Sequence, residues 1–398
     1  TTAFYPFYQT MPTGVENSGW LINGKKPNTA SAPGIVSAEM TWETVRSWNI
    51  GFDFGLLNNR LTGSFDYFVR NTLDMIGPAP QLPATLGATV PKVNNADMKA
   101  WGFEVEVSWR DRIKDFNYGV KFVLSDDQRK VTRYPNEELN RNQWYAGRMD
   151  GLVWGYETVG IAKTDAEMEA HLASLPNGGQ SQLGSKWAAG DIMYKDLNGD
   201  GKISSGDGTL NDLGDLKVVA NTQLRFKYGL TLDASWKGFD FSAFFQGVGK
   251  RDVVVGGPYF WGANGQGMWQ AAAFKDHMDY FRPEDTESVF GPNVDAYYPR
   301  VIFGGGSSEG GKNTLTQSRY VQNGAYIRLK NLQLGYTLPS TITKKFAVNS
   351  LRVYVSGDNL WTGTKMRVFD PEVLGSTGDA GKAYPLARVW SVGLNVNF

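Results

Sequence analysis

The chain has 398 residues, a formal net charge of zero, two histidines and no cysteine. Balanced charge argues against a nucleic-acid partner, which would favour a basic face, and the lack of cysteine excludes a disulfide framework and thiolate chemistry. No apolar run approaches the roughly 18–20 residues of a membrane-spanning helix, whereas 13% aromatic residues and 47 glycines favour β-structure with many turns.

Apolar and polar residues alternate with a period of two along much of the chain, which is the pattern of β-strands with two chemically different faces. In WNIGFDFG, Trp48, Ile50 and Phe52 point to one side, and Asn49 and Asp53 point to the other. The last segment, VWSVGLNVNF, repeats the pattern. The nine strands expected in this way span residues 42–54, 60–72, 100–110, 116–128, 224–236, 239–249, 325–338, 350–361 and 387–398.

The expected strands are about 11–14 residues long, whereas strands of soluble proteins mostly have about 5–6 residues and a tilted strand needs about 9–11 to cross a bilayer. Length therefore favours an all-β fold, a transmembrane antiparallel β-barrel with an apolar outer face and a polar lumen face. A large soluble sandwich or barrel with one solvated face would show the same alternation and stays open as the alternative.

Short and long connections alternate along the chain, as in outer-membrane barrels with short periplasmic turns and long extracellular loops. We therefore expect residues 1–41 to form an extracellular loop and lead-in, and residues 42–398 to form a barrel segment. Bacterial single-chain barrels have an even number of strands, so nine strands indicate either that further strands lack the alternating pattern or that the chain is part of a larger barrel. The short connections are 55–60, 111–115 and 237–239, with 339–349 of middling length, and the long ones are 73–99, 129–223, 250–324 and 362–386.

The N-terminal stretch TTAFYPFYQT lacks a basic segment followed by an apolar one, so we expect no signal peptide in this sequence. This expectation agrees with a chain that supplies only part of a larger barrel.

Oxygen-bearing side chains in DLNGDGKISSGD have the spacing of an EF-hand-type calcium loop. Asp196, Asn198 and Asp200 stand at the first, third and fifth positions. Lys202 offers its backbone carbonyl at the seventh, and Asp207 stands at the twelfth, where Glu is usual. Gly201 suits the sharp turn at the sixth position, and Ile203 at the eighth can anchor the loop by packing.

A ligand set made only of oxygen atoms on a flexible loop favours Ca²⁺ over Mg²⁺. We expect a structural ion that stiffens the connection 129–223, which offers few apolar residues for packing. The shorter side chain of Asp207 leaves open whether it closes the site. A turn rich in Asp and Asn without an ion is the alternative.

Catalytic residues are not expected. His171 and His277 lie in helix-like stretches, where a solvated surface role suits the first and a packing role the second. No Ser-His-Asp arrangement and no two-histidine zinc motif can be argued. The aromatic residues of PYFWGANGQGMWQ, residues 258–270, could contact a ligand or pack the core of their own loop, and both readings stay open.

Several blocks of the chain, in this order, resemble the SusC/RagA-like family of TonB-dependent outer-membrane transporters. The blocks are TWETVRSWNIGFDFGLLNNRLTGSFDYFVRNTLDMI (41–76), GLVWGYETVGIAKTDAEM (151–168), GDIMYKDLNGDGKISSGD (190–207), NGAYIRLKNLQLGYTLP (323–339), SLRVYVSGDNLWTGTKMRVFDPEV (350–373) and YPLARVWSVGLNVNF (384–398).

The resemblance implies the C-terminal strands of a 22-stranded barrel in the outer membrane of a Gram-negative bacterium, in contact with outer-membrane lipid. It implies import of oligosaccharides or peptides, a SusD-like surface lipoprotein as a lid, and energy from TonB through an N-terminal part that has no counterpart here. A soluble calcium-dependent glycan-binding β-protein is the alternative. In that protein the apolar rows of residues 48–54, 226–236 and 390–398 would be buried in a core.

Overall fold

The computed structural model describes residues 8–9, 11, 13–15, 20–30, 33–37, 40–77, 85, 90–264, 273–303, 308–367, 369–374 and 384–398. The chain forms two compact units. The first comprises residues 1–48, 69–101 and 129–149, and the second comprises residues 49–68, 102–128 and 150–398. Within the described ranges, no helix is both long and apolar enough to cross a lipid bilayer.

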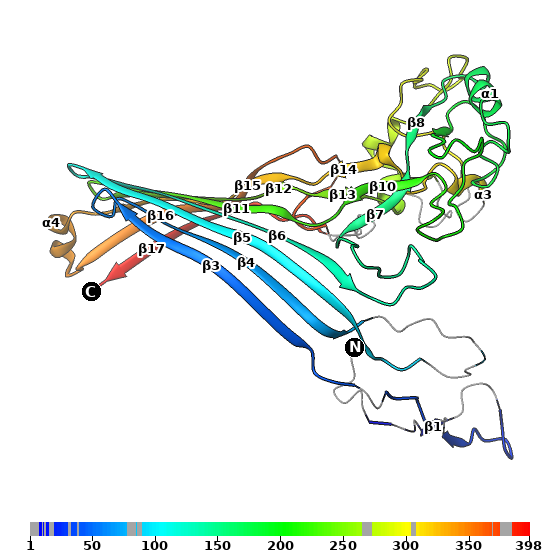
Figure 1. Cartoon of the computed structure of the whole chain (residues 1–398). Helices are drawn as coiled ribbons and strands as arrows, with labels where there is room; N and C mark the ends of the chain where they lie inside the picture. Colours follow the sequence, from blue (N-terminus) through cyan, green and yellow to red (C-terminus); the bar gives the residue numbers. More distant parts are fainter. Residues whose placement is uncertain are drawn as a thin grey trace. The chain divides into compact units, whose positions relative to one another are not determined.

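All nine long strands expected from the sequence are present, and they form one antiparallel sheet (Figure 1). Each strand pairs with the next long strand along the chain, so the sheet is a meander that begins at β3 and ends at β17. The expected ends differ from the observed ones mainly in β5, which is 20 residues long. The strands are β3 (Thr44–Leu56), β4 (Leu61–Ile76), β5 (Asn94–Ile113), β6 (Phe116–Arg133), β11 (Arg225–Trp236), β12 (Phe239–Lys250), β15 (Tyr326–Thr337), β16 (Ser350–Thr364) and β17 (Val389–Asn397).

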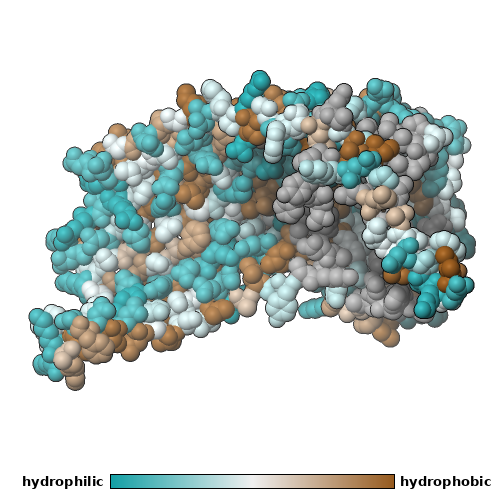
Figure 2. Space-filling view, turned by 90° about the horizontal axis from the view of Figure 1, so that it is seen from below, coloured by the Kyte–Doolittle hydropathy of each residue, from teal (hydrophilic) through white to brown (hydrophobic). Residues whose placement is uncertain are grey.

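Alternation along the strands gives this sheet one apolar and one polar face, because directly paired residues point to the same side. In the second unit, the residues paired across neighbouring strands form rows, and polar rows alternate with apolar rows. One row is polar and consists of Asp233, Ser242, Gln333, Ser356 and Ser391. The next row is apolar and consists of Ala234, Phe241, Leu334, Val355 and Val392. Over the sheet surface that Figure 2 presents, hydrophilic residues predominate, with hydrophobic residues between them.

The apolar face is exposed. Leu334 is 57% exposed, Val392 is 79% exposed and Trp390 is 67% exposed. On β3, Ile50 and Phe52 are exposed to a similar degree. These rows are therefore exposed. The soluble alternative requires them to be buried in a protein core.

A row of aromatic residues crosses the apolar face at the end that carries the short turns. Trp236 pairs with Phe116 on one side and with Phe239 on the other, and Phe239 pairs with Tyr336. The ring centroids of Phe239 and Tyr336 are 4.5 Å apart. These four residues are called the aromatic row below.

The two longest connections, expected as separate loops, fold together into one globule with its own core. Its short strands pair locally, and buried residues from both connections pack against one another, including Ile192, Tyr194, Phe260, Tyr298 and Tyr320. The expectation that residues 129–223 have little apolar packing is therefore wrong. The strands are β7 (Leu152–Tyr156), β8 (Thr158–Ile161), β9 (Ile192–Tyr194), β10 (Leu216–Asn221), β13 (Asp252–Val254) and β14 (Val321–Asn323).

Buried charges also join the two connections in this globule. Asp191 and Lys312 are both fully buried, and the Asp191 Oδ2 atom lies 3.0 Å from the Lys312 Nζ atom. The Arg300 Nε atom donates to the Asp191 Oδ1 atom at 2.7 Å, and the Asn313 side chain donates to the same oxygen at 2.8 Å. Because these partners come from segments more than 100 residues apart, the network ties one long loop to the other.

The helices of the globule are short. The expected helix around His171 is α1 (Asp165–Ala173), whose N-terminus is capped by the Thr164 side chain. The expected helix around His277 is only one 3₁₀ turn, η2 (Lys275–Met278). The other short helices are α2 (Pro258–Trp261), α3 (Ser308–Gly311) and η3 (Ser318–Tyr320).

The first unit has a small cluster of its own, in which Ala96, Val131 and Tyr134 are buried. The strands β1 (Thr13–Val15) and β2 (Asn28–Ala30) pair within residues 1–41. Parts of the expected loops 73–99 and 362–386, and parts of the lead-in, lie outside the described residues. The middling connection 339–349 contains α4 (Ser340–Thr343) and the 3₁₀ turn η4 (Lys344–Phe346).

Candidate functional site

The aspartate-rich loop directly follows β9 and is shaped by its own side chains. The Asp196 Oδ1 atom accepts from the Gly199 N–H at 2.6 Å, and its Oδ2 atom accepts from the Gly201 N–H at 2.9 Å. Gly201 has a φ of +76°, so the sharp turn expected at this glycine is present. Asp196 therefore holds the first half of the loop closed.

The next two predicted ligands make the same kind of bond one step further along. The Asn198 Oδ1 atom accepts from the Asp200 N–H at 3.0 Å, and the Asp200 Oδ1 atom accepts from the Lys202 N–H at 3.1 Å. The Lys202 Nζ atom lies 3.8 Å from the Asp200 Oδ2 atom. Three of the predicted side chains are thus brought together on a single tight loop.

Ile203 anchors this loop, as expected from its place after Lys202. Its side chain is fully buried in the core of the globule. Its N–H donates to the Gly179 carbonyl at 2.8 Å. Packing and a backbone bond therefore fix the loop.

Asp207 and Asp215 differ in the segments to which their carboxylates are hydrogen-bonded. The Asp207 Oδ1 atom accepts from the Thr209 N–H at 2.7 Å, within its own turn. Asp215 is fully buried, and its two oxygens accept from the Leu197 and Ser204 N–H groups, both at 2.7 Å. Asp215 therefore joins the two ends of the aspartate-rich loop, a role that the sequence pattern did not assign. The signal in the sequence was an aspartate between Leu213 and Leu216, on a segment returning to the core.

The charges of the loop influence one another. Burial raises the pKa of Asp215, the nearby Asp196 and Asp200 charges raise it further, and the bonds from Leu197 and Ser204 only partly oppose this. Burial also acts on Asp196, but the N–H groups of Gly201 and Gly199 outweigh it and hold the pKa of Asp196 below its usual value. Negative charge is thus concentrated around this loop.

The groups on the loop that could bind a metal ion are two carboxylates, a carboxamide and a backbone carbonyl. Hard cations such as Ca²⁺ prefer oxygen ligands of this kind. In the part of the chain that the structure describes, no three Asp, Glu or His side chains are gathered in the arrangement of a metal site. The loop thus offers oxygen atoms of the kind that a hard cation binds, and the calcium site stays a prediction.

Neither histidine belongs to a catalytic arrangement. His171 is half-buried, and its Nε2 atom lies 3.2 Å from the Oε1 atom of the buried Gln180. The His277 Nδ1 atom accepts from the Phe274 N–H at 3.0 Å, and its ring packs beside Tyr298. Of the aromatic residues in 258–270, Phe260 and Trp261 are buried in the globule core, while Tyr259 is partly exposed and stacks on Phe274. Trp269 lies outside the described residues.

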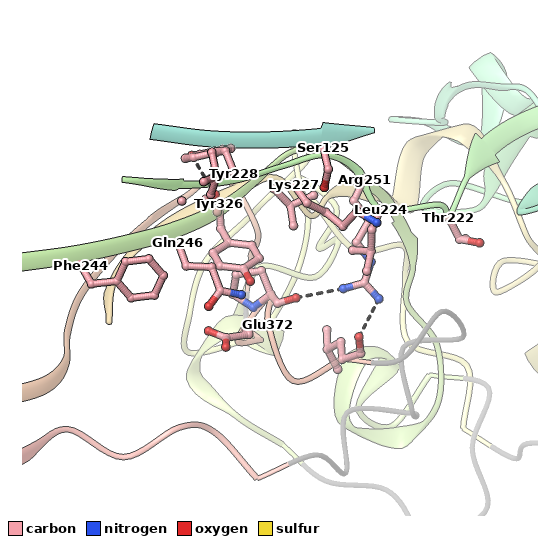
Figure 3. A pocket seen from close by; sticks show the side chains of 16 residues that line it. Ser125, Thr222, Leu224, Lys227, Tyr228, Phe244, Gln246, Arg251, Tyr326 and Glu372 are labelled. Atoms are coloured by element: carbon pink, nitrogen blue, oxygen red, sulfur yellow. Dashed lines mark hydrogen bonds between the residues drawn. The ribbon is translucent and has the colours of Figure 1, made fainter. Parts of the chain in front are cut away.

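A cavity of about 660 Å³ opens on the polar face of the second unit, at the end of the sheet that carries the long loops (Figure 3). Its walls come from β6, β11, β12 and β15, and from residues 371–374, which fold back over the sheet. Arg251 holds this segment by donating to the Pro371 and Leu374 carbonyls at 3.0 and 2.6 Å. The sequence did not predict this cavity, because its walls come from segments far apart in the chain.

Comparison with known proteins identifies the family of this fold. The profile of the family described as "TonB dependent receptor-like, beta-barrel" matches residues 4–235. TonB-dependent receptor P3 of Formosa agariphila is 27% identical over 402 residues, which cover 95% of this chain and 36% of that protein. TonB-dependent receptor SusC of Bacteroides thetaiotaomicron is 23% identical, over 93% of this chain and 33% of that protein.

A solved structure has the same fold. The RagAB peptide transporter matches with a TM-score of 0.69 and 22% identity, over 98% of this chain and 38% of that chain. This chain therefore spans about one third of the length of the relatives that it matches.

Proposed function

The chain belongs to the family of TonB dependent receptor-like β-barrels, and on this basis we propose that it forms the C-terminal wall of a transporter in the outer membrane of a Gram-negative bacterium. Its relatives are TonB-dependent receptors, not enzymes. The observation that carries the proposal is the sheet with two faces, one exposed and apolar and the other polar.

The dimensions of the strands support a membrane location. The strand β11 has 12 residues, and at about 3.3 Å per residue with a tilt of about 45° it rises roughly 28 Å, close to the thickness of a bilayer core. The aromatic row lies at the short-turn end of the apolar face, where barrels place a girdle of aromatic residues at the membrane interface. An exposed apolar face of this height is stable in lipid and costly in water.

The cargo and the partners are part of the same proposal. We propose import of oligosaccharides or peptides through the lumen that the polar face lines, with TonB acting through an N-terminal part of the protein. A SusD-like surface lipoprotein would dock on the long loops. Exposed apolar side chains on the globule, such as Phe274, Val289 and Phe290, support a protein partner there.

The soluble glycan-binding alternative is disfavoured. It requires the apolar rows of β3, β11 and β17 to be buried, whereas Phe52, Trp236 and Leu394 are 60%, 51% and 60% exposed.

Transport can be tested with the full-length protein in its native host. Uptake of neutral oligosaccharides and of short peptides would be followed by mass spectrometry in wild-type cells, in cells lacking this protein, and in cells lacking TonB. We expect one of the two mixtures to be consumed only when both proteins are present. Equal consumption in all three strains would contradict the proposal.

We also propose that the aspartate-rich loop holds a structural Ca²⁺, with Mg²⁺ a poorer fit. The side chains of Asp196, Asn198 and Asp200 and the carbonyl of Lys202 would supply ligands, and Asp207 or Asp215 would complete the set. When bound, the ion would offset the negative charge of the loop and stiffen the globule. The oxygen-bearing side chains of Asp196, Asn198 and Asp200 on one tight loop support this proposal.

Calcium binding can be measured by titrating CaCl₂ or MgCl₂ into the chelator-treated full-length protein in a calorimeter. We expect heat of binding from Ca²⁺ at lower concentration than from Mg²⁺, and at least tenfold weaker binding in Asp200→Asn. Parallel titrations of Asp207→Asn and Asp215→Asn identify the carboxylate that closes the site. Absence of binding, or wild-type affinity in Asp200→Asn, would contradict the proposal.

A further inference from the structure

The cavity of about 660 Å³ on the polar face is called the lumen-side cavity below. Its wall contains an aromatic residue at a position where the alternation along the strand predicts a polar one. Phe244 pairs with Thr231 on β11 and with Asn331 on β15, so it points to the polar face. Its side chain is nevertheless 37% exposed. An exposed aromatic ring on a polar face costs free energy in water unless something covers it.

Gly229 on the neighbouring strand makes room for this ring. A Cβ atom at Gly229 would lie 3.2 Å from the Phe244 Cε2 atom and 3.0 Å from the Val123 Cγ2 atom. Because glycine leaves this space open, the ring can lie beside the backbone of β11. Phe244 therefore offers a flat apolar surface at the side of the cavity.

The charged groups that line the cavity are already compensated. The Lys227 Nζ atom lies 2.8 Å from the Asp127 Oδ1 atom. The Glu372 carboxylate contacts Lys330 at 2.8 Å and Arg328 at 3.1 Å. Since Arg251 is engaged with two carbonyl groups, a charged ligand would have to displace an existing interaction or leave its own charge unpaired, and both are costly.

The uncharged polar groups are the ones left for a ligand. Among the described residues, neither the Gln246 amide nor the Ser125 hydroxyl makes a hydrogen bond with another part of the protein, and both side chains line the cavity. In Figure 3, Gln246 and Phe244 project from β12 to the same side. An amide can donate to one hydroxyl group and accept from another.

We infer that this cavity is a binding subsite for a neutral sugar unit of the imported cargo, with Phe244 as its stacking surface and Gln246 as its hydrogen-bonding group. The apolar face of a sugar ring can cover an aromatic ring, while its hydroxyl groups suit an amide and a hydroxyl. The volume of about 660 Å³ lies within the range of about 300–1,000 Å³ typical of small-molecule sites. This inference rests on the proposed transport function and selects oligosaccharide over peptide.

The test uses the purified full-length transporter in detergent. Equilibrium dialysis against a mixture of neutral oligosaccharides from starch, inulin, xylan and mannan, and separately against peptides from a casein digest, would identify retained compounds by mass spectrometry. We expect retention of an oligosaccharide, at least tenfold weaker in Phe244→Ala and at least fivefold weaker in Gln246→Leu, which keeps the volume of the side chain. Phe245→Ala is the matched control, because Phe245 points to the apolar face, and its affinity should stay within twofold of wild type.

Retention of peptides that depends on Phe244, equal retention of the sugar by both variants and wild type, or retention of neither mixture would overturn the subsite. Uptake assays separate this result from the transport proposal. TonB-dependent uptake with unchanged sugar affinity in Phe244→Ala and Gln246→Leu would overturn the subsite alone, whereas sugar binding without TonB-dependent uptake would overturn the transport function alone.

Discussion

The buried charge network between the two long loops gives a quantitative prediction. Asp191 is fully buried and accepts hydrogen bonds from Arg300 at 2.7 Å and Asn313 at 2.8 Å, with Lys312 at 3.0 Å. In Asp191→Asn the fully buried Lys312 keeps, among the described residues, only the Glu309 carboxylate as an anionic partner, at 3.1 Å. Removing one partner of a buried pair costs about 3–5 kcal/mol, because a buried charge is left uncompensated.

This cost should appear as faster proteolysis of the globule in the full-length protein. When opening is fast relative to cleavage, the cleavage rate follows the population of the open form, and each 1.4 kcal/mol changes that population about tenfold. We therefore expect cleavage within residues 152–323 to be roughly 100-fold to 3,000-fold faster in Asp191→Asn, as measured by mass spectrometry of timed digests. Adding Lys312→Met removes the excess positive charge and should slow cleavage at least fivefold relative to the single variant.

Asp295→Asn is the matched control. Asp295 also pairs across the two loops, with Lys163 at 2.5 Å, but the two side chains are 79% and 54% exposed. Exposed pairs contribute about 0–1 kcal/mol, so cleavage of this variant should stay within about fivefold of wild type. Similar cleavage rates for Asp191→Asn and Asp295→Asn would refute the reasoning.

Three further predictions concern single residues. Ile203→Ala removes a fully buried side chain and should destabilise the globule by about 2–5 kcal/mol, visible as faster proteolysis; a wild-type rate would show that Ile203 does not anchor the loop. Although burial opposes it, hydrogen bonds from Arg367, Asn293 and the Tyr297 N–H hold the pKa of Asp279 below its usual value. The stability that this carboxylate contributes is therefore present above about pH 4 and lost as the pH falls below it. Proteolysis by pepsin should accelerate less steeply with falling pH in Asp279→Asn than in wild type, and identical profiles would contradict this. Gly229→Val should displace the Phe244 ring and weaken sugar retention about tenfold, since a Cβ there would lie within 3.2 Å of the ring; unchanged retention would show that the ring does not need this space.

The strands were predictable because their pattern is local. A period of two needs only neighbouring residues, and it located all nine strands of the sheet and the short turns between them. The strand ends were less accurate, as in β5, because its first residues, Asn94 and Asn95, are polar and carry no alternating signal. Pairing with neighbouring strands extends β5 there.

The globule was not predictable in the same way, because its contacts are distant in sequence. Its two halves were expected as separate loops, yet Tyr194 and Tyr320, from different connections, lie in one buried cluster. The apolar residues of the 95-residue connection 129–223 are spaced irregularly. Without a regular spacing, the sequence does not indicate which of them pack together. Asp215 was missed for the same reason, since its partners are Leu197 and Ser204 rather than its neighbours.

The lumen-side cavity left one local signal in the sequence. In FDFSAFFQGV the alternation places Phe239, Phe241 and Phe245 on one face, so the doublet of Phe244 and Phe245 forces one aromatic ring onto the polar face. Such a break in the period marks an aromatic residue that does not face the apolar side of the sheet. The partners that complete the cavity, such as Glu372, could not be inferred without the fold.

The assignment of the two faces of the sheet is tested most directly by lipid contact along β17. Single cysteines at positions 390–395 of the full-length protein, reconstituted in vesicles and labelled with an environment-sensitive dye, would be challenged with lipids that carry a quencher in their acyl chains. We predict strong quenching at Trp390→Cys, Val392→Cys and Leu394→Cys and weak quenching at Ser391→Cys and Asn395→Cys. Uniform quenching, or the opposite alternation, would contradict the account.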